Sequence, residues 1–150
     1  MYFVDRKKLE ETLQYMDELI NILKISPPKT LSDKLSLERA IHVFIESTLD
    51  VGNMMIDGFI MRDPGSYNDI INILLDEKVI PKEEERAYKE LISLRRMLIS
   101  AYTSVDHNVL IKTIQTNLTI YKQFSTHVRN YLNEEHQQVT HAFTNEPKSQ

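Results

Sequence analysis

The sequence predicts an all-α fold, an antiparallel bundle of four long helices and one short helix. Only 3 glycines and 5 prolines occur among its 150 residues, so few positions can turn a tight hairpin. Apolar residues recur at spacings of three and four over long segments, the pattern of amphipathic helices. Long helices joined by few loops satisfy both observations, and we therefore expect no sheet.

The composition is that of one globular domain. Hydrophobic residues make up 41% of the chain and charged residues 27%, and a chain of 150 residues can bury one core. The absence of cysteine favours a reducing compartment, and no apolar run is long enough to span a bilayer. The formal net charge of −4 gives no general attraction to nucleic acid. We expect a cytoplasmic chain, not bound to a membrane, that contacts RNA only through a local site.

Two long helices open the chain. The first is expected to begin at an Asp5 cap and to end at Pro27 and Pro28. The second is expected to begin at a Ser36 cap and to run to about Met61. One of its sides carries Leu37, Ile41, Phe44, Ile45, Thr48, Met55 and Phe59, and another carries Ala40, Val43, Val51, Met54 and Gly58. Because this helix is apolar on two sides, we expect it to be covered on both, and the excess apolar surface predicts a homodimer.

A short helix follows a turn and cap signal at residues 63–66 that ends in Ser66. Its inward-facing residues are predicted to be Tyr67, Ile70, Ile71, Leu74 and Leu75. Pro81 is predicted at the first position of a fourth helix that continues to about Tyr102. The glutamates at 83–85 suit the positive end of that helix and are expected to be solvated.

The last helix is predicted to begin at an Asp106 cap. Its inward-facing apolar residues end at Leu132, beyond which the chain becomes polar. We therefore expect one helical bundle over residues 1–132 and a polar, flexible tail over residues 133–150.

One charged residue interrupts the apolar stripe of the fourth predicted helix. Arg95 lies at the centre of a stripe formed by Tyr88, Leu91, Ile92, Leu98, Ile99 and Tyr102. A guanidinium that loses water needs a carboxylate or another anion beside it. Two interpretations stay open: an ion pair with Asp50, Asp57 or another carboxylate of the second helix, or a phosphate site.

The segment at 95–102 reads RRMLISAY and resembles the signature of the HepT-like HEPN family of bacterial helical-bundle toxins. That signature is an arginine, four residues, a histidine, any residue and a tyrosine. The resemblance extends over about residues 4–132 and includes LERA at 37–40, ESTLD at 46–50, PGSY at 64–67 and LLDEKVI at 74–80.

The resemblance implies a homodimer whose two motifs face a shared cleft, often beside a minimal nucleotidyltransferase antitoxin. Family members with the full motif are metal-independent ribonucleases. Arg95 matches the motif arginine and Tyr102 the tyrosine, which makes Tyr102 a candidate for adenylylation. Ser100 stands in the place of the histidine, and Arg96 stands where many relatives have asparagine.

The replacement at Ser100 limits the activity that the resemblance implies. Metal-free RNA cleavage needs a proton acceptor and a proton donor, and losing such a group removes roughly 10²- to 10⁴-fold of rate. Arg95, Arg96 and Tyr102 can still hold a phosphate, so we expect a regulatory module that binds RNA, a nucleotide or a partner protein without efficient cleavage. Two alternatives remain: an active ribonuclease toxin in which Ser100 or His107 stands in for the histidine, and a purely structural interaction protein.

Helix geometry favours one pair within the motif. On an unbroken helix Ser100 points about 140° away from Arg95, whereas Tyr102 returns to within about 20°. The pair Arg95 and Tyr102 is therefore the better supported of the two from the sequence.

No other chemistry is predicted. The histidines at 42, 107, 127, 136 and 141 show no shared spacing with acids that metal ligands use, so we expect no metal. Gly65 is not followed by the lysine and hydroxyl of a phosphate loop, and we expect no cofactor. The methionines at 54, 55, 61 and 97 are expected to fill the core or a dimer interface.

Overall fold

A computed structural model describes residues 4–24 and 27–142, and its side chains as far as residue 135. Every regular element in these residues is helical, so the predicted fold class is confirmed. The elements are α1 (Arg6–Leu23), α2 (Leu31–Gly58), α3 (Tyr67–Asp76), the 3₁₀ turn η1 (Lys82–Glu84), α4 (Glu85–Ser93), α5 (Arg95–Ser100) and α6 (His107–Ala142). None of the described helices is long and apolar enough to cross a membrane.

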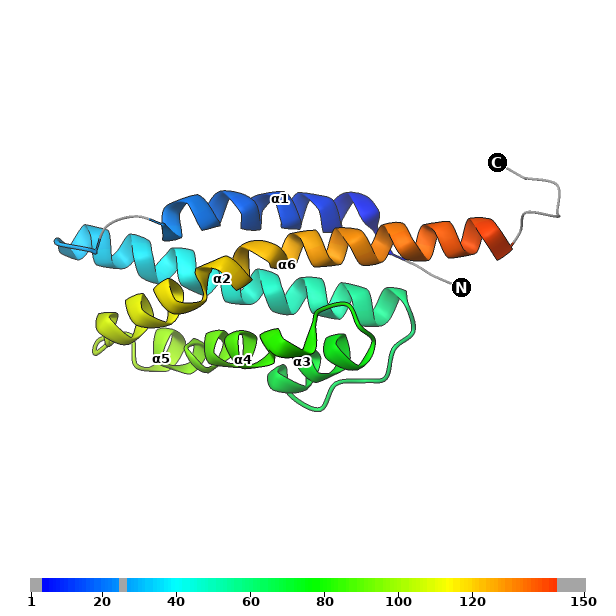
Figure 1. Ribbon diagram of the computed structural model, residues 1–150. Helices are drawn as coiled ribbons and strands as arrows, with labels where there is room; N and C mark the ends of the chain where they lie inside the picture. Colours follow the sequence, from blue (N-terminus) through cyan, green and yellow to red (C-terminus); the bar gives the residue numbers. More distant parts are fainter. Residues whose placement is uncertain (1–3, 25–26, 143–150) are drawn as a thin grey trace.

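Helix α2 runs through the middle of the bundle (Figure 1). It packs against α1 on one side and against α3 and α5 on the other, while α6 packs against α1 and α4. Ala40, Val51 and Gly58, on the second apolar side of α2, are buried, and Val43 and Met54 are half-buried against the core. Neighbours within the same chain thus cover this side, and it gives no support to the predicted dimer.

The ends of the first two helices are set by capping side chains. Asp5 accepts a hydrogen bond from the Lys8 backbone N–H, as expected for the α1 cap. The predicted Ser36 cap of α2 is wrong, because Thr30 and Asp33 form a capping box that begins the helix at Leu31. Helix α1 ends at Leu23, before the two prolines.

Gly52 allows α2 and α3 to approach closely. A β-carbon at this position would overlap the Cγ2 methyl of Ile70, which is itself buried. Because a β-branched side chain in a packed core has no room to move away, a larger residue at position 52 must push the two helices apart.

Gly52→Ala is expected to destabilise the protein although alanine is the better helix former. Overpacking costs about 1–3 kcal/mol, and the gain in helix propensity returns about 1 kcal/mol. Urea denaturation should therefore show a lower free energy of unfolding for Gly52→Ala than for wild type. The variant Asn53→Ala, changed at the exposed neighbouring position, should show no such loss. Equal or greater stability of Gly52→Ala would contradict the close packing.

The start of the fourth predicted helix differs from the expectation. Pro81 precedes the 3₁₀ turn η1, and Glu84 is buried rather than solvated. Its carboxylate accepts hydrogen bonds from the Tyr88 hydroxyl at 3.0 Å and from His127 Nε2 at 3.1 Å. Burial and the Glu84 carboxylate raise the pKa of Tyr88 well above its usual value. This buried cluster joins η1 and α4 to α6.

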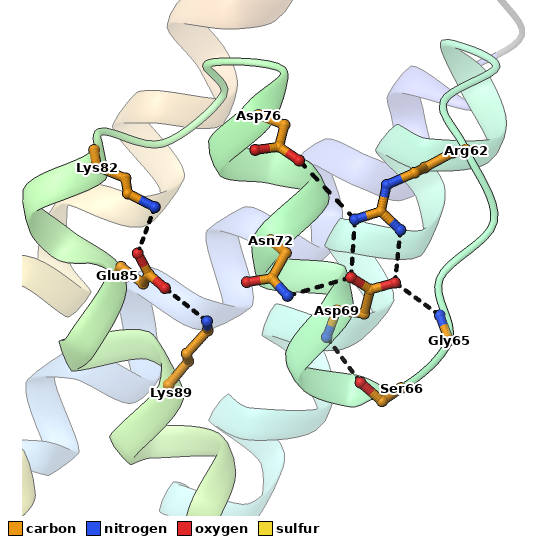
Figure 2. Close-up of polar contacts among 9 residues, drawn as sticks. All are labelled: Arg62, Gly65, Ser66, Asp69, Asn72, Asp76, Lys82, Glu85 and Lys89. Atoms are coloured by element: carbon orange, nitrogen blue, oxygen red, sulfur yellow. Dashed lines mark hydrogen bonds and ion pairs between the residues drawn. The ribbon is translucent and has the colours of Figure 1, made fainter.

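Glu83 is exposed, as predicted, whereas Glu85 is half-buried between two lysines. Lys82 and Lys89 each donate to its carboxylate at 2.7 Å, as Figure 2 shows. These bonds lower its pKa to about 2.

The fourth predicted helix is interrupted at Leu94. Ser93 ends α4, and Leu94 bonds through its N–H to the Leu91 carbonyl three residues earlier, which tightens the turn. Helix α5 then runs only from Arg95 to Ser100 instead of continuing to Tyr102. Angles calculated for an unbroken helix consequently do not apply beyond Ser100.

The last helix begins as predicted and extends further than expected. Asp106 Oδ1 accepts bonds from the backbone N–H groups of Asn108 and Val109. Arg129 binds Glu10 and Asp17 and thereby fastens α6 to α1, and its bonds lower the pKa of Glu10. The helix continues past Leu132 to Ala142, whereas a frayed tail was expected from residue 133. Residues 143–150 lie outside the described part of the chain.

Asp69 organises the loop that leads into α3. Its carboxylate receives two bonds from the Arg62 guanidinium, at 2.7 and 2.9 Å, and one from the Gly65 N–H at 2.9 Å (Figure 2). These donors hold the pKa of Asp69 well below its usual value. Ser66 caps α3 by accepting from the Asp69 N–H, which confirms the turn and cap predicted at residues 63–66. The loop therefore fixes where α3 begins.

Candidate functional site

Arg95 is held by a carboxylate of the second helix, one of the two interpretations that the sequence left open. Its Nε donates to Glu46 Oε1 at 2.6 Å. The named alternatives Asp50 and Asp57 are both exposed. The Arg95 side chain retains 26% of its exposure and that of Glu46 retains 35%, so water still reaches the pair.

The first residue of α3 supplies a second contact. The guanidinium carbon of Arg95 lies 4.4 Å from the centre of the Tyr67 ring, within the range of a cation–π interaction. Tyr67 was predicted to face inward, but it is exposed and lies beneath Arg95 instead. Neither terminal guanidinium nitrogen of Arg95 has a hydrogen-bond partner among the described residues. Both can therefore donate to a bound anion.

Arg95 lines a cleft of about 430 Å³ between the start of α3 and one face of α4 and α5. The lining residues are Ser66, Tyr67, Asn68, Ile92, Ser93, Arg95, Arg96, Ile99 and Ser100. Three of the four predicted site residues thus meet there: Arg95, Arg96 and Ser100. The expected pairing of Arg95 with Tyr102 is not found, because α5 ends at Ser100 and Tyr102 is 68% exposed beyond it, away from the lining.

Glu46 also contacts a histidine that sequence reasoning did not connect with the motif. His42 Nε2 lies 3.4 Å from Glu46 Oε1, the oxygen that accepts from Arg95. His42 and Glu46 are four residues apart and so share one face of α2, a spacing that the sequence displays. The sequence alone does not show that α5 brings Arg95 to that face of α2.

The other described histidines are bound elsewhere. His107 Nε2 lies 2.7 Å from Glu38 Oε2, and His127 contacts the buried Glu84. His107 does not line the cleft, which weakens the suggestion that it replaces the motif histidine. His136 and His141 belong to the part of α6 whose side chains are not described. The described residues contain no group of acids and histidines that could hold a metal ion.

The arrangement suits binding of an anion better than proton transfer. A guanidinium fixed at Nε presents its remaining donors in a planar fork that matches phosphate oxygens. Ser100 offers a hydroxyl, which accepts no proton efficiently near neutral pH. A wider hollow of about 630 Å³ over η1 and α4 is lined largely by charges that already pair with one another, among them Glu85 and Arg86. The smaller cleft is therefore the candidate site.

Comparison with known proteins identifies the family of this chain. Residues 7–128 match the family described as "Ribonuclease HepT-like". A Bacillus subtilis (strain 168) protein named "Putative RNase YutE" is 42% identical over 136 residues, which cover 90% of this chain and 94% of that protein. A solved structure described as the cytosolic protein YutE from Bacillus subtilis has a TM-score of 0.86 and covers 90% of this chain and 95% of that one.

More distant structures share the fold. A structure described as a toxin–antitoxin with AMP-PNP has a TM-score of 0.71 at 13% identity, covering 80% of this chain and 96% of that one. A tri-AMPylated Shewanella oneidensis HEPN toxin in complex with MNT antitoxin has a TM-score of 0.69 at 15% identity, covering 82% and 95%. The family match over residues 7–128 and the 42% identity to the Bacillus subtilis protein show that the chain belongs to the HepT-like ribonuclease family.

Proposed function

We propose that this chain is a cytoplasmic RNA-binding module of toxin–antitoxin lineage, whose ribonuclease site is degenerate and holds a phosphate group without cleaving RNA efficiently. The observation that carries the proposal is the state of Arg95. Glu46 and Tyr67 fix its guanidinium, while both terminal nitrogens stay without partners among the described residues, in a cleft large enough for a nucleotide phosphate. Arg96 adds a second positive charge to the same cleft.

The energies favour a binding role over a purely structural one. A partly exposed ion pair contributes about 0–1 kcal/mol to stability, and a cation–π contact about 0.5–1 kcal/mol. Losing one partner of a fully buried pair would cost about 3–5 kcal/mol instead. Since water reaches both Arg95 and Glu46, the fold gains little from placing an arginine there.

Ser100 is the reason to expect weak or absent cleavage. The resemblance places a histidine at this position, and imidazole can accept the proton of the 2′-hydroxyl and later donate one to the leaving oxygen. Ser100 lines the cleft beside Arg95, so a histidine there would lie beside a bound phosphate.

Cleavage of a mixed RNA pool in EDTA tests this proposal. Wild type is expected to be inert, while Ser100→His is expected to cleave because it restores the missing proton acceptor. The double variant Ser100→His/Arg95→Ala is expected to lose that activity again, since nothing then holds the phosphate. The products are resolved on a denaturing gel.

Circular dichroism and urea denaturation provide the control. Arg95→Ala is expected to remain folded and to lose no more than about 1–2 kcal/mol of stability. A loss of about 3–5 kcal/mol would support the interpretation that Arg95 has a purely structural role. Inactivity of Ser100→His in a folded protein would contradict a site that lacks only its histidine.

An active ribonuclease toxin is the second candidate. It is supported by the 42% identity to a protein named as an RNase. Arg95-dependent cleavage by wild type in the experiment above would establish this candidate and overturn the proposed loss of activity.

We also propose that two copies of the chain form a dimer through one end of the bundle. The last turns of α1 and α5 and the first turns of α2 and α6 lie toward that end (Figure 1). Five of the exposed large hydrophobic side chains belong to these turns. They are Ile22, Leu31, Leu35, Ile99 and Val109. Such a concentration of exposed apolar side chains is typical of interaction surfaces.

Sedimentation velocity tests the dimer. Wild type is expected to sediment as a dimer at micromolar concentration, and Leu31→Lys/Leu35→Lys is expected to shift it to a monomer, because two charges would be desolvated at the interface. Tyr15→Lys is the matched control, since Tyr15 is also exposed but lies in the middle of α1. A monomeric wild type would refute the dimer.

Tyr102 is proposed as the site at which a minimal nucleotidyltransferase antitoxin adds a nucleotide. The support is the resemblance, together with the 68% exposure of Tyr102 in the turn after α5, where another protein can reach its hydroxyl. Mass spectrometry of the chain co-expressed with such a nucleotidyltransferase should find adenylylated Tyr102 and none on a Tyr102→Phe variant. Unmodified wild type after co-expression would defeat this proposal.

A further inference from the structure

One carboxylate oxygen of Glu46 lies close to two basic side chains. Arg95 Nε lies 2.6 Å from Oε1 and His42 Nε2 lies 3.4 Å from the same atom. The two basic side chains thus share one acceptor atom, and Arg95 makes the shorter contact with it. His42 keeps 29% of its side-chain exposure, so protons from solvent reach it.

The charges around His42 are few and come from several helices. On α2 itself Glu46 lies one turn later, and Glu38 and Arg39 lie one turn earlier. Arg95 approaches from α5, and Tyr67 of α3 contributes its ring through Arg95. From α6, His107 binds Glu38, and no described bond joins a side chain of α1 to His42.

We propose that His42 acts on the phosphate-binding site through Glu46, and that its protonation offsets the negative charge of Glu46 and strengthens the binding of a phosphodiester to Arg95. This inference rests on the proposed function, because it describes control of the same cleft.

The charges of the cluster give the direction of the effect. With neutral His42, Glu46 and Arg95 cancel, and a phosphate meets no net charge from this cluster. With protonated His42 the cluster carries one positive charge, while Glu46 still orients the guanidinium through Nε. One added charge on a partly exposed side chain is expected to change phosphodiester affinity by roughly threefold to tenfold.

Calorimetric titration with a short oligouridylate tests the proposal. Its phosphodiesters and its bases keep the same charge between about pH 5.5 and about pH 8, where histidine changes charge. Wild type is expected to bind roughly threefold to tenfold more tightly at the lower pH. His42→Gln is expected to bind with nearly equal affinity at both, because glutamine can still contact Glu46 but cannot gain a proton.

His107→Gln is the matched control. His107 also lies within bonding distance of a glutamate of α2, but that residue is Glu38 and not the Glu46 that binds Arg95, so this variant is expected to keep the wild-type pH dependence. Circular dichroism at both pH values checks that each variant is folded. A His42→Gln variant that keeps the full pH dependence, or a wild type that shows none, would overturn the inference.

Arg95→Ala separates this inference from the proposed function. If that variant binds the oligouridylate as wild type does, the proposed phosphate site is itself wrong. If binding depends on Arg95 and the pH dependence does not depend on His42, only the role of His42 fails.

Discussion

The burial of α2 on two sides is the constraint on which the rest of the structure depends. One side is covered by α1 and the other by α3 and α5, and Gly52 lets α3 approach without a side chain between them. Because α5 must lie on α2, the arginine that begins α5 meets the polar positions of that helix. The position of the candidate site therefore follows from the packing of the core.

The ion pair between Arg95 and Glu46 then sets what the cleft can do. It orients the guanidinium through Nε and leaves the terminal nitrogens without partners among the described residues, so that they can donate to an anion. Tyr67, placed by the capped start of α3, supports the same group from below. Partial exposure keeps the stabilising value of these contacts small. A cationic group that contributes little to stability and retains free donors is more useful for binding than for folding.

The sequence predicted much of this and failed at identifiable places. Apolar spacing gave the helical class, and the cap residues Asp5, Ser66 and Asp106 gave three helix starts correctly. Thr30 was overlooked because Ser36 offered a second capping side chain nearby. Glu84 was misjudged because a run of glutamates suggests a solvated turn, whereas its burial depends on Tyr88 and on His127 from a distant helix.

The candidate site was predicted only in part, because its contacts also depend on how distant helices pack together. Arg95 stood out as a charge in an apolar stripe, and a carboxylate of the second helix was expected beside it. Which carboxylate it is, and that His42 shares it, depends on how α5 lies across α2, which no local spacing specifies. The break at Leu94 and the end of α5 at Ser100 likewise removed Tyr102 from the pairing that regular helix geometry suggested.

The measurement that tests the central claim most directly is the affinity of a short oligouridylate for wild type and for Arg95→Ala at one fixed pH and low salt. A charge-assisted hydrogen bond to phosphate contributes about 1.5–3 kcal/mol, so removal of the Arg95 guanidinium is expected to weaken binding by roughly 10- to 100-fold. Equal affinity of the two folded proteins would show that the cleft is not a phosphate site.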